Sequence, residues 1–243
     1  MLLDVVKRAE GTSLRGERGK MTKLELLPPL DESQLRVFES GLPCPLPGEV
    51  RELLAYCSGL TGEFGDTVAE VRFSGTDGFG MEEVFPHCVD VAHDGAGNFW
   101  VVDLVSDSTT WAPVFYACHD PPVILFQTDS FAHFLSELLK LGNPPWESEL
   151  RYVHEDEAGV WRTNPGMLTR EQCLASGDAD LEAFAHTLEE AWLVKDLRRP
   201  ALGDGFSWGL FGARTELRRF GEKRIFAYRQ PEKRGVWQRL RGR

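Results

Sequence analysis

The sequence predicts an α+β protein, with a mainly antiparallel sheet flanked by helices and a smaller α+β unit after it. Three observations support this class: two short helical patterns come first, short β-type runs separated by brief turns follow, and a helical pattern closes the series. Connections this short join antiparallel neighbours, because parallel strands need a long crossover. With 243 residues, the chain can also bury a substantial core.

Two short helices are expected in DESQLRVFESGLPCPLPGEVRELLAYCSGL. Residues 31–33 offer a cap for the first helix, and Gly41 ends it. Pro47 suits the first turn of the second helix, where a backbone N–H has no helical partner in any case. Apolar residues of that helix recur at i, i+3, i+4 and i+7, which predicts one buried stripe. The stripe consists of Val50, Leu53, Leu54 and Cys57.

Short β-type runs follow, each bounded by Gly, Asp, Ser or Pro. They are AEVRF at 69–73, FWVVDLV at 99–105, APVFYAC at 112–118 and PVILFQ at 122–127. The pattern DSFAHFLSELLKLG then predicts a helix that is capped by Asp129 or Ser130 and ends at Gly142. We expect this helix to cover the sheet.

The stretch VDVAHDGAGNFWVVDL, residues 89–104, contains a conspicuous cluster of Gly, Asp and Asn. A dinucleotide-binding loop needs its glycines between a strand and a helix, and a P-loop needs a Lys and a Ser or Thr at fixed offsets. The cluster leads into a strand instead, and it lacks the acidic ligands of an EF-hand. We therefore expect a hairpin turn in which Gly95 or Gly97 has a positive φ.

Three of these stretches together resemble the SUKH superfamily (Smi/Knr-type). LPCPLPGEVRELLAYCSGL resembles its helical entry, VDVAHDGAGNFWVVDL its aDGxGNxxxxD signature, and APVFYACHD with TDSFAHFLSELL its later strands and closing helix. The resemblance covers about residues 30–142 and implies a SUKH-like α+β fold used as a protein-binding module. Most bacterial members of this superfamily are immunity proteins that neutralise a cognate toxin, commonly a nuclease, whereas fungal relatives act in cell-wall regulation.

The charge of the chain is distributed very unevenly. Residues 24–192 carry seven basic and thirty acidic side chains, whereas residues 193–243 carry fourteen basic and five acidic ones. The acidic field repels nucleic acid and anionic membranes and raises the encounter rate with a basic protein, such as a toxin domain. The alternative interpretation is that acidity only keeps the protein in solution.

The sequence suggests four parts. Residues 1–29 form a flexible N-terminal segment, 30–142 the SUKH-like domain, 143–175 a linker, and 176–243 a small basic α+β unit. The basic unit contains a predicted hairpin, TELRRFGEKRIFAYR, that turns near Gly221. Its positive side chains either pack against the acidic part or form a surface for nucleic acid or another protein.

No residue pattern predicts catalysis, a cofactor or a metal site. None of the six histidines lies in a metal-binding or hydrolase motif. The His87–Cys88 and Cys118–His119 pairs do not make a four-ligand site, because neighbours on a strand face opposite sides. The five cysteines lack a CxxC pair and are expected to be reduced and mostly buried. We therefore expect a protein that is not an enzyme.

A protein partner would be met by acidic loops and strand ends around the sheet, with tryptophan anchors. The candidate residues are Asp66, Glu82, Glu83, Asp94, Trp100, Asp103, Asp107 and Trp111. Trp100 lies inside a strand and is somewhat better explained as core, whereas Trp111 follows a polar loop and is expected to be exposed. The chain has no secretory signal or membrane-length apolar run, so a cytoplasmic location is expected. The competing function is a regulatory or scaffold protein of the same fold.

Overall fold

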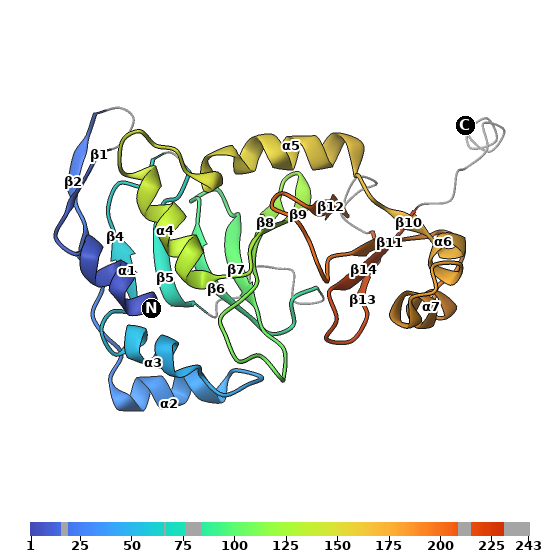
Figure 1. The fold of residues 1–243 in the computed structure, drawn as a ribbon, viewed down its shortest axis with the longest axis horizontal. Coiled ribbons are helices and arrows are strands. Elements are labelled where there is room, and N and C mark those ends of the chain that lie inside the picture. Colours follow the sequence, from blue (N-terminus) through green and yellow to red (C-terminus); the bar gives the residue numbers. More distant parts are fainter. Residues whose placement is uncertain (16–18, 66, 76–83, 209–214, 231–243) are drawn as a thin grey trace, which may run out of the picture.

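The structure is a computed structural model that describes residues 1–15, 19–65, 67–75, 84–208 and 215–230. Within these residues the chain forms a large antiparallel sheet of eight strands and a second sheet of four strands (Figure 1). The large sheet has the order β12-β9-β8-β7-β6-β5-β4-β3, and the second sheet has the order β10-β11-β14-β13. A short pair, β1-β2, lies apart from both. This architecture confirms the predicted α+β class.

The large sheet contains the strands that the sequence predicts. Its members are β3 (Glu25–Leu26), β4 (Gly59–Thr61), β5 (Glu70–Gly75), β6 (Cys88–His93), β7 (Phe99–Asp103), β8 (Val114–His119), β9 (Pro122–Thr128) and β12 (Gly205–Ser207). The β-type runs correspond to β5, β7, β8 and β9, which confirms the antiparallel meander. The added strand β12 comes from the C-terminal part and pairs with β9.

The helices before and after the meander begin and end close to the predicted residues. They are α2 (Glu32–Ser40), α3 (Gly48–Leu54) and α4 (Phe131–Leu141). Asp31 caps α2 by accepting hydrogen bonds from the backbone N–H groups of Ser33 and Gln34, and Ser130 caps α4. The segment expected to be flexible, residues 1–29, holds α1 (Leu2–Ala9), β1 (Ser13–Arg15) and β2 (Met21–Lys23). Val6 of α1 is fully buried.

The central strands are buried on both faces. On β7, Trp100 and Val102 belong to the core that α4 covers, whereas Val101 between them belongs to a second core on the opposite face. On β8, Tyr116 and Phe115 divide in the same way. Side chains alternate along a strand, so an apolar run without polar interruptions requires a cover on each face.

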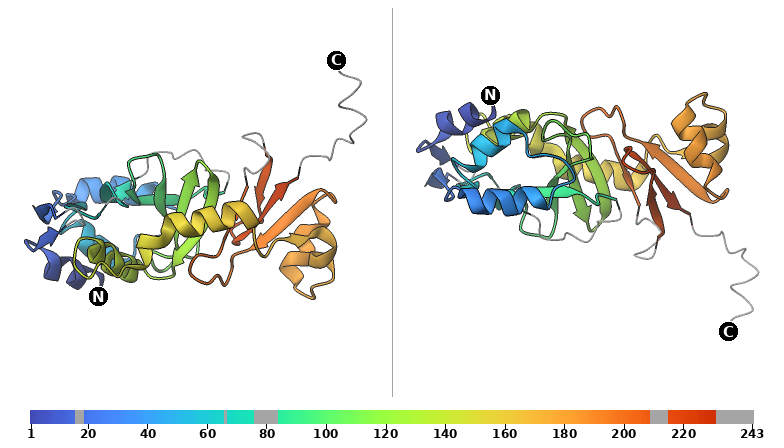
Figure 2. Two further views of the ribbon diagram at one scale, coloured as in Figure 1. Left: turned by 90° about the horizontal axis from the view of Figure 1, so that it is seen from above. Right: turned by 90° about the horizontal axis from the view of Figure 1, so that it is seen from below.

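The C-terminal part provides the second cover. It contains η1 (Glu149–Tyr152), α5 (Val153–Thr163), β10 (Leu168–Thr169), α6 (Arg170–Leu174), α7 (Ala179–His186), β11 (Trp192–Asp196), β13 (Leu217–Arg219) and β14 (Ile225–Arg229). Leu197, Phe206 and Phe226 pack in one cluster with Val101 and Phe115 of the large sheet. Figure 2 shows α5 running along the large sheet toward the second sheet.

Residues 143–175, expected as a linker, therefore hold η1, α5 and α6 rather than an extended connection. The predicted hairpin is confirmed as β13-β14, with Gly221 at φ 57° in its turn. The division of the chain into these four parts stays a prediction. In the described part of the chain, no helix combines the length and the apolar character needed to cross a membrane.

Candidate protein-binding surface

The DGAGN turn joins β6 to β7 and is held by its own polar side chains. One carboxylate oxygen of Asp94 accepts hydrogen bonds from the backbone N–H groups of Ala96 and Asn98, at 2.8 and 3.1 Å. The Asn98 amide donates to the other Asp94 oxygen at 2.6 Å. Gly95 and Gly97 have φ values of 81° and 94°, so the expectation of a positive φ is confirmed. Asp94 is therefore committed to the turn.

The same turn is fastened to the next hairpin through Asn98. Its side-chain oxygen accepts a hydrogen bond from the backbone N–H of His119 at 3.1 Å and lies 2.9 Å from the Nδ1 atom of that residue. His119 ends β8, directly before the turn to β9. Because Asn98 is 6% exposed, its amide acts inside the structure. The signature residues Asp94 and Asn98 thus hold two hairpins in register.

Both tryptophans named as anchors are buried, so the prediction that Trp111 is exposed is wrong. Trp111 is 1% exposed and packs edge-on against Phe38 of α2 and Phe131 of α4. Trp100 is fully buried beside Tyr116 and Phe134, as its core interpretation predicts. Neither indole can touch a partner in this conformation.

Asp103 is also not a surface residue. It is fully buried at the end of β7, where both of its carboxylate oxygens bind Arg219 of β13, at 2.7 and 2.9 Å. Arg224 donates to the same carboxylate at 2.7 Å and to the Asp103 carbonyl at 3.1 Å. Arg219 is 3% exposed and also donates to the carbonyl of Val84. Asp103 therefore joins the large sheet to the C-terminal hairpin.

Of the remaining candidates, Asp107 is exposed in the loop after β7. Asp66, Glu82 and Glu83 lie outside the described residues. Of the acidic residues predicted to contact a partner, only Asp107 is thus both described and clearly exposed without a side-chain role in a turn or a buried ion pair. Other exposed acidic side chains lie around η1.

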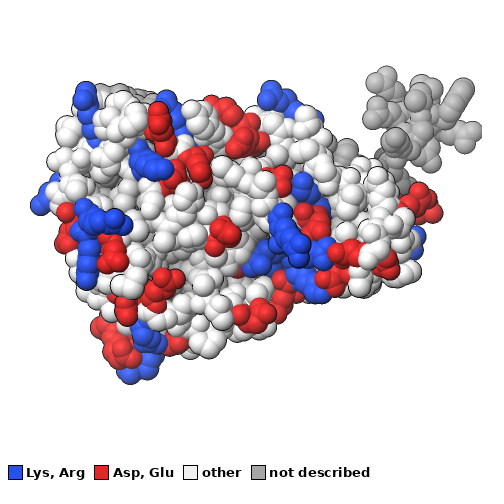
Figure 3. All heavy atoms as spheres, viewed as in Figure 1, with Lys and Arg blue, Asp and Glu red and all other residues white. Residues whose placement is uncertain are grey.

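Acidic and apolar side chains come together around η1, within the stretch 143–175 that the sequence predicts as a linker. Residues 129–157 carry seven acidic and two basic side chains. The exposed members around η1, which we call the η1 face, are Asp129, Glu147, Glu149, Tyr152, Glu155 and Leu202. Tyr152 is 57% and Leu202 47% exposed, a high value for large apolar side chains. Figure 3 shows acidic side chains over η1 and the start of α5 on this face.

The η1 face is built from three segments that contact one another. Glu149 of η1, Asp129 before α4, and Pro200 line one open hollow of about 440 Å³. The loop that contains Leu202 continues to Gly203, whose position lies against the Asp156 carboxylate of α5. Partial burial, with a smaller contribution from Glu155, raises the pKa of Asp156 above its ordinary value.

Several of the C-terminal basic side chains that the structure describes are paired with carboxylates of the same chain. Arg198 binds Asp178, Asp180 and Asp196, and Arg229 binds Glu189 and Glu216. Those pairs lie within the C-terminal part, whereas Arg219 and Arg224 reach Asp103 of the large sheet. The interpretation that the positive unit packs against the acidic part therefore has its support from Asp103.

A charge cluster of another kind lies at the edge of the η1 face. His133, Glu137 and Glu149 place one ligand atom each within 4.8 Å of one another. This cluster matches no known metal-binding motif, so the sequence patterns above do not predict it. The available signal was the spacing of His133 and Glu137, which puts both on one face of a helix.

Comparison with known proteins identifies the central part of the chain. Residues 29–137 match the model of the SMI1 / KNR4 family (SUKH-1). No curated protein and no solved structure matches the chain. The matched residues run from the segment before α2 to α4, and they include the Asp94–Asn98 turn and the strands β4 to β9. Residues 29–137, somewhat less than half of the chain, are therefore similar to the SMI1 / KNR4 family (SUKH-1).

Proposed function

We propose that this chain is an immunity-type inhibitor that binds a basic bacterial toxin domain in the cytoplasm, and that it contacts this partner through the η1 face. The observation that carries the proposal is the exposed Tyr152 and Leu202 among acidic side chains on that face. The role is binding rather than catalysis. A nuclease toxin suits the surface, because a nuclease presents positive charge to its substrate.

The two kinds of side chain have different expected effects. Exposed carboxylates attract a positive partner over a distance, so they chiefly set the association rate and its dependence on salt. An aromatic side chain that becomes desolvated at the centre of an interface slows dissociation. A tyrosine is well suited to this position because it buries a large area while keeping one polar group.

The experiment measures binding kinetics between this chain and the toxin domain encoded by a neighbouring gene. That domain is purified as a catalytically inactive variant. Variant one combines Asp129→Asn, Glu147→Gln and Glu155→Gln, and variant two is Tyr152→Ala. We expect about tenfold slower association at low salt for the first, with a weaker salt dependence. We expect about 30-fold faster dissociation for the second, which corresponds to about 2 kcal/mol.

A matched control removes the same charge elsewhere. Glu25, Glu49 and Glu52 are exposed on β3 and α3. Figure 1 shows α3 well separated from α5, which follows η1. Their replacement by Gln should leave dissociation unchanged. Val37→Ala provides the apolar control, since Val37 is 73% exposed on α2. If the control variants reduce binding as much as the η1 variants, or if neither η1 variant changes the kinetics, the proposed surface is wrong.

The competing function is a regulatory or scaffold protein of the same fold, whose basic C-terminal part binds nucleic acid or another protein. Residues 231–243 carry five basic side chains and one acidic one, which favours this reading. Binding of the full chain to nucleic acid, with an affinity that falls when residues 231–243 are removed, would support it. Inhibition of an adjacent toxin by a chain shortened in this way would favour the immunity function.

A further inference from the structure

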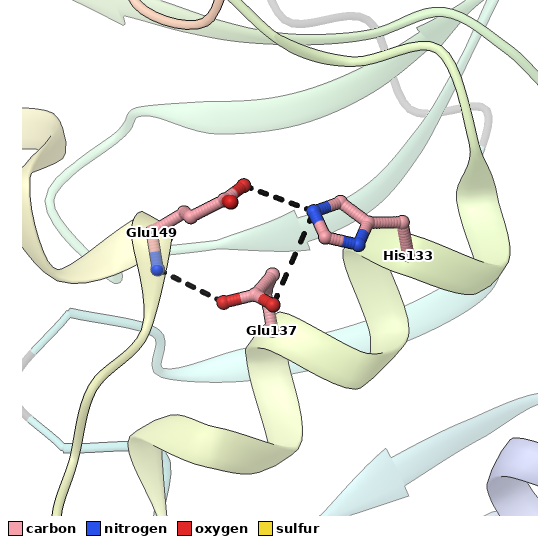
Figure 4. A group of neighbouring side chains, drawn as sticks. All are labelled: His133, Glu137 and Glu149. Atoms are coloured by element: carbon pink, nitrogen blue, oxygen red, sulfur yellow. Dashed lines mark hydrogen bonds and ion pairs between the residues drawn. The ribbon is translucent and has the colours of Figure 1, made fainter.

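We propose that His133, Glu137 and Glu149 form a binding site for a divalent transition metal ion, with Zn²⁺ as the best match. Figure 4 shows the three side chains converging between α4 and η1. The set offers one imidazole nitrogen and two carboxylate oxygens, which are donors that Zn²⁺ accepts. The proposal does not depend on the identity of a protein partner.

The distances suit one metal ion. The Nε2 atom of His133 lies 2.9 Å from a Glu149 carboxylate oxygen and 4.0 Å from a Glu137 carboxylate oxygen. Two ligands at about 2.1 Å from a tetrahedral ion are roughly 3.4 Å apart, between these two values. Shifts of about half an ångström would therefore bring the His133 nitrogen to coordination spacing from each carboxylate oxygen, and rotation of the exposed His133 and Glu149 side chains can supply such shifts. All three ligand atoms already lie within 4.8 Å of one another.

The site is prepared by contacts between the two elements that carry it. The second oxygen of Glu137 accepts a hydrogen bond from the backbone N–H of Glu149 at 2.9 Å. The Ser148 hydroxyl donates to the Glu137 carbonyl at 2.8 Å. Glu137 itself is 2% exposed, so its carboxylate has little freedom to turn away. Hydrogen bonds of this kind hold a ligand in the orientation that a metal requires.

Charge and access also favour a cation. A buried carboxylate requires a positive partner, and in the structure Glu137 receives one from Lys140, whose side chain is 54% exposed. His133 and Glu149 line the 440 Å³ hollow, which leaves room for a water molecule or another ligand on the fourth side. Because an exposed lysine can swing into solvent, the ion would replace its ammonium group at Glu137.

The test is a titration of the full-length chain with Zn²⁺ by calorimetry, repeated with Mg²⁺ and with Co²⁺, whose visible absorption reports tetrahedral ligands. We expect one equivalent of Zn²⁺ to bind, with at least tenfold weaker binding in His133→Gln and in Glu149→Gln. Both side chains are more than 40% exposed, so both variants should fold. Lys140→Gln should bind Zn²⁺ more tightly, because it removes the competing ammonium group.

The chain offers a matched control in His154 and Glu157 of α5, a His–Glu pair at 3.4 Å that has no third ligand in the described part of the chain. His154→Gln should leave Zn²⁺ binding unchanged. Absence of saturable Zn²⁺ binding by the full chain would overturn the proposal. It would also be overturned by binding that persists in both ligand variants, since the ion would then lie elsewhere, for example at cysteines.

Discussion

Replacing Asp103 with Ala tests whether the C-terminal hairpin is anchored on the large sheet. The change removes the only carboxylate that faces both Arg219 and Arg224 among the described residues. Breaking a buried ion pair by removing one partner costs about 3 to 5 kcal/mol, because the other charge stays buried without compensation. The total stability of a domain is only about 5 to 15 kcal/mol.

The surroundings of the two arginines decide where in that range the loss falls. Arg219 would keep hydrogen bonds to the carbonyls of Val84, Glu222 and Lys223, which offset part of the cost. Arg224 is 22% exposed and can turn toward water. We therefore expect the lower end, about 3 kcal/mol, for Asp103→Ala. Asp103→Asn keeps the shape and part of the hydrogen bonding, so about half that loss is expected.

The assay is unfolding in urea followed by tryptophan fluorescence, with the midpoint and slope compared between variants. Glu189→Ala is the control, since Glu189 pairs with Arg229 at the surface and is 69% exposed. That exposed pair should contribute less than about 1 kcal/mol. A loss below 1 kcal/mol for Asp103→Ala, or one equal to that of the control, would refute the anchoring role.

Three further predictions follow from the fold. Gly97→Val should destabilise the protein by at least about 1 kcal/mol, and by more than Asn98→Ser does. The reason is that Gly97 has a φ of 94° and that a Cβ added to it would lie 3.0 Å from the His119 ring. Equal urea midpoints of the two variants would contradict this prediction. Burial raises the pKa of Cys57 to about 11 and that of Cys118 to about 12, whereas a cysteine in the unfolded chain has a pKa of roughly 8.5. The free energy of unfolding should therefore fall as the pH rises from about 8.5 toward 11, because the unfolded chain loses these protons first. Mass spectrometry should also find that half-buried Cys88 is alkylated before Cys57 and Cys118. A chain that ends at residue 142 should bind a dye for exposed apolar surface, because Val101, Phe115 and Ile124 would lose the C-terminal residues that cover them. A soluble fragment that binds no dye would show instead that residues 1–142 fold independently.

Local patterns in the sequence predicted most of the central domain. The caps at Asp31 and Ser130 and the turn at Gly95 and Gly97 depend on neighbouring residues, so they could be read from short stretches. The helix α5 was missed because its sequence, VHEDEAGVWRT, is mostly polar and buries only a few side chains. The strand β12 was missed because three residues carry little periodicity, and its pairing with β9 is a long-range contact.

The candidate site was harder to predict, because exposure is decided by distant parts of the chain. Trp111 follows a polar loop, yet it inserts between Phe38 and Phe131, which come from helices on either side in sequence. Asp103 looked like an acidic strand end, and its partner Arg219 lies 116 residues away. No pattern around either residue reports such a contact.

The uneven distribution of charge along the chain also has a structural role. The excess of basic residues after position 193 is partly used to pair carboxylates that would otherwise be buried alone, as Arg219 and Arg224 do at Asp103. The cover formed by Leu197, Phe206 and Phe226 also hides one face of β7 to β9. A partner therefore cannot reach that face while the cover is in place. Of the acidic surfaces that the structure describes, the η1 face lies outside this cover and combines exposed carboxylates with an exposed tyrosine, which is why we propose it as the surface for a basic partner.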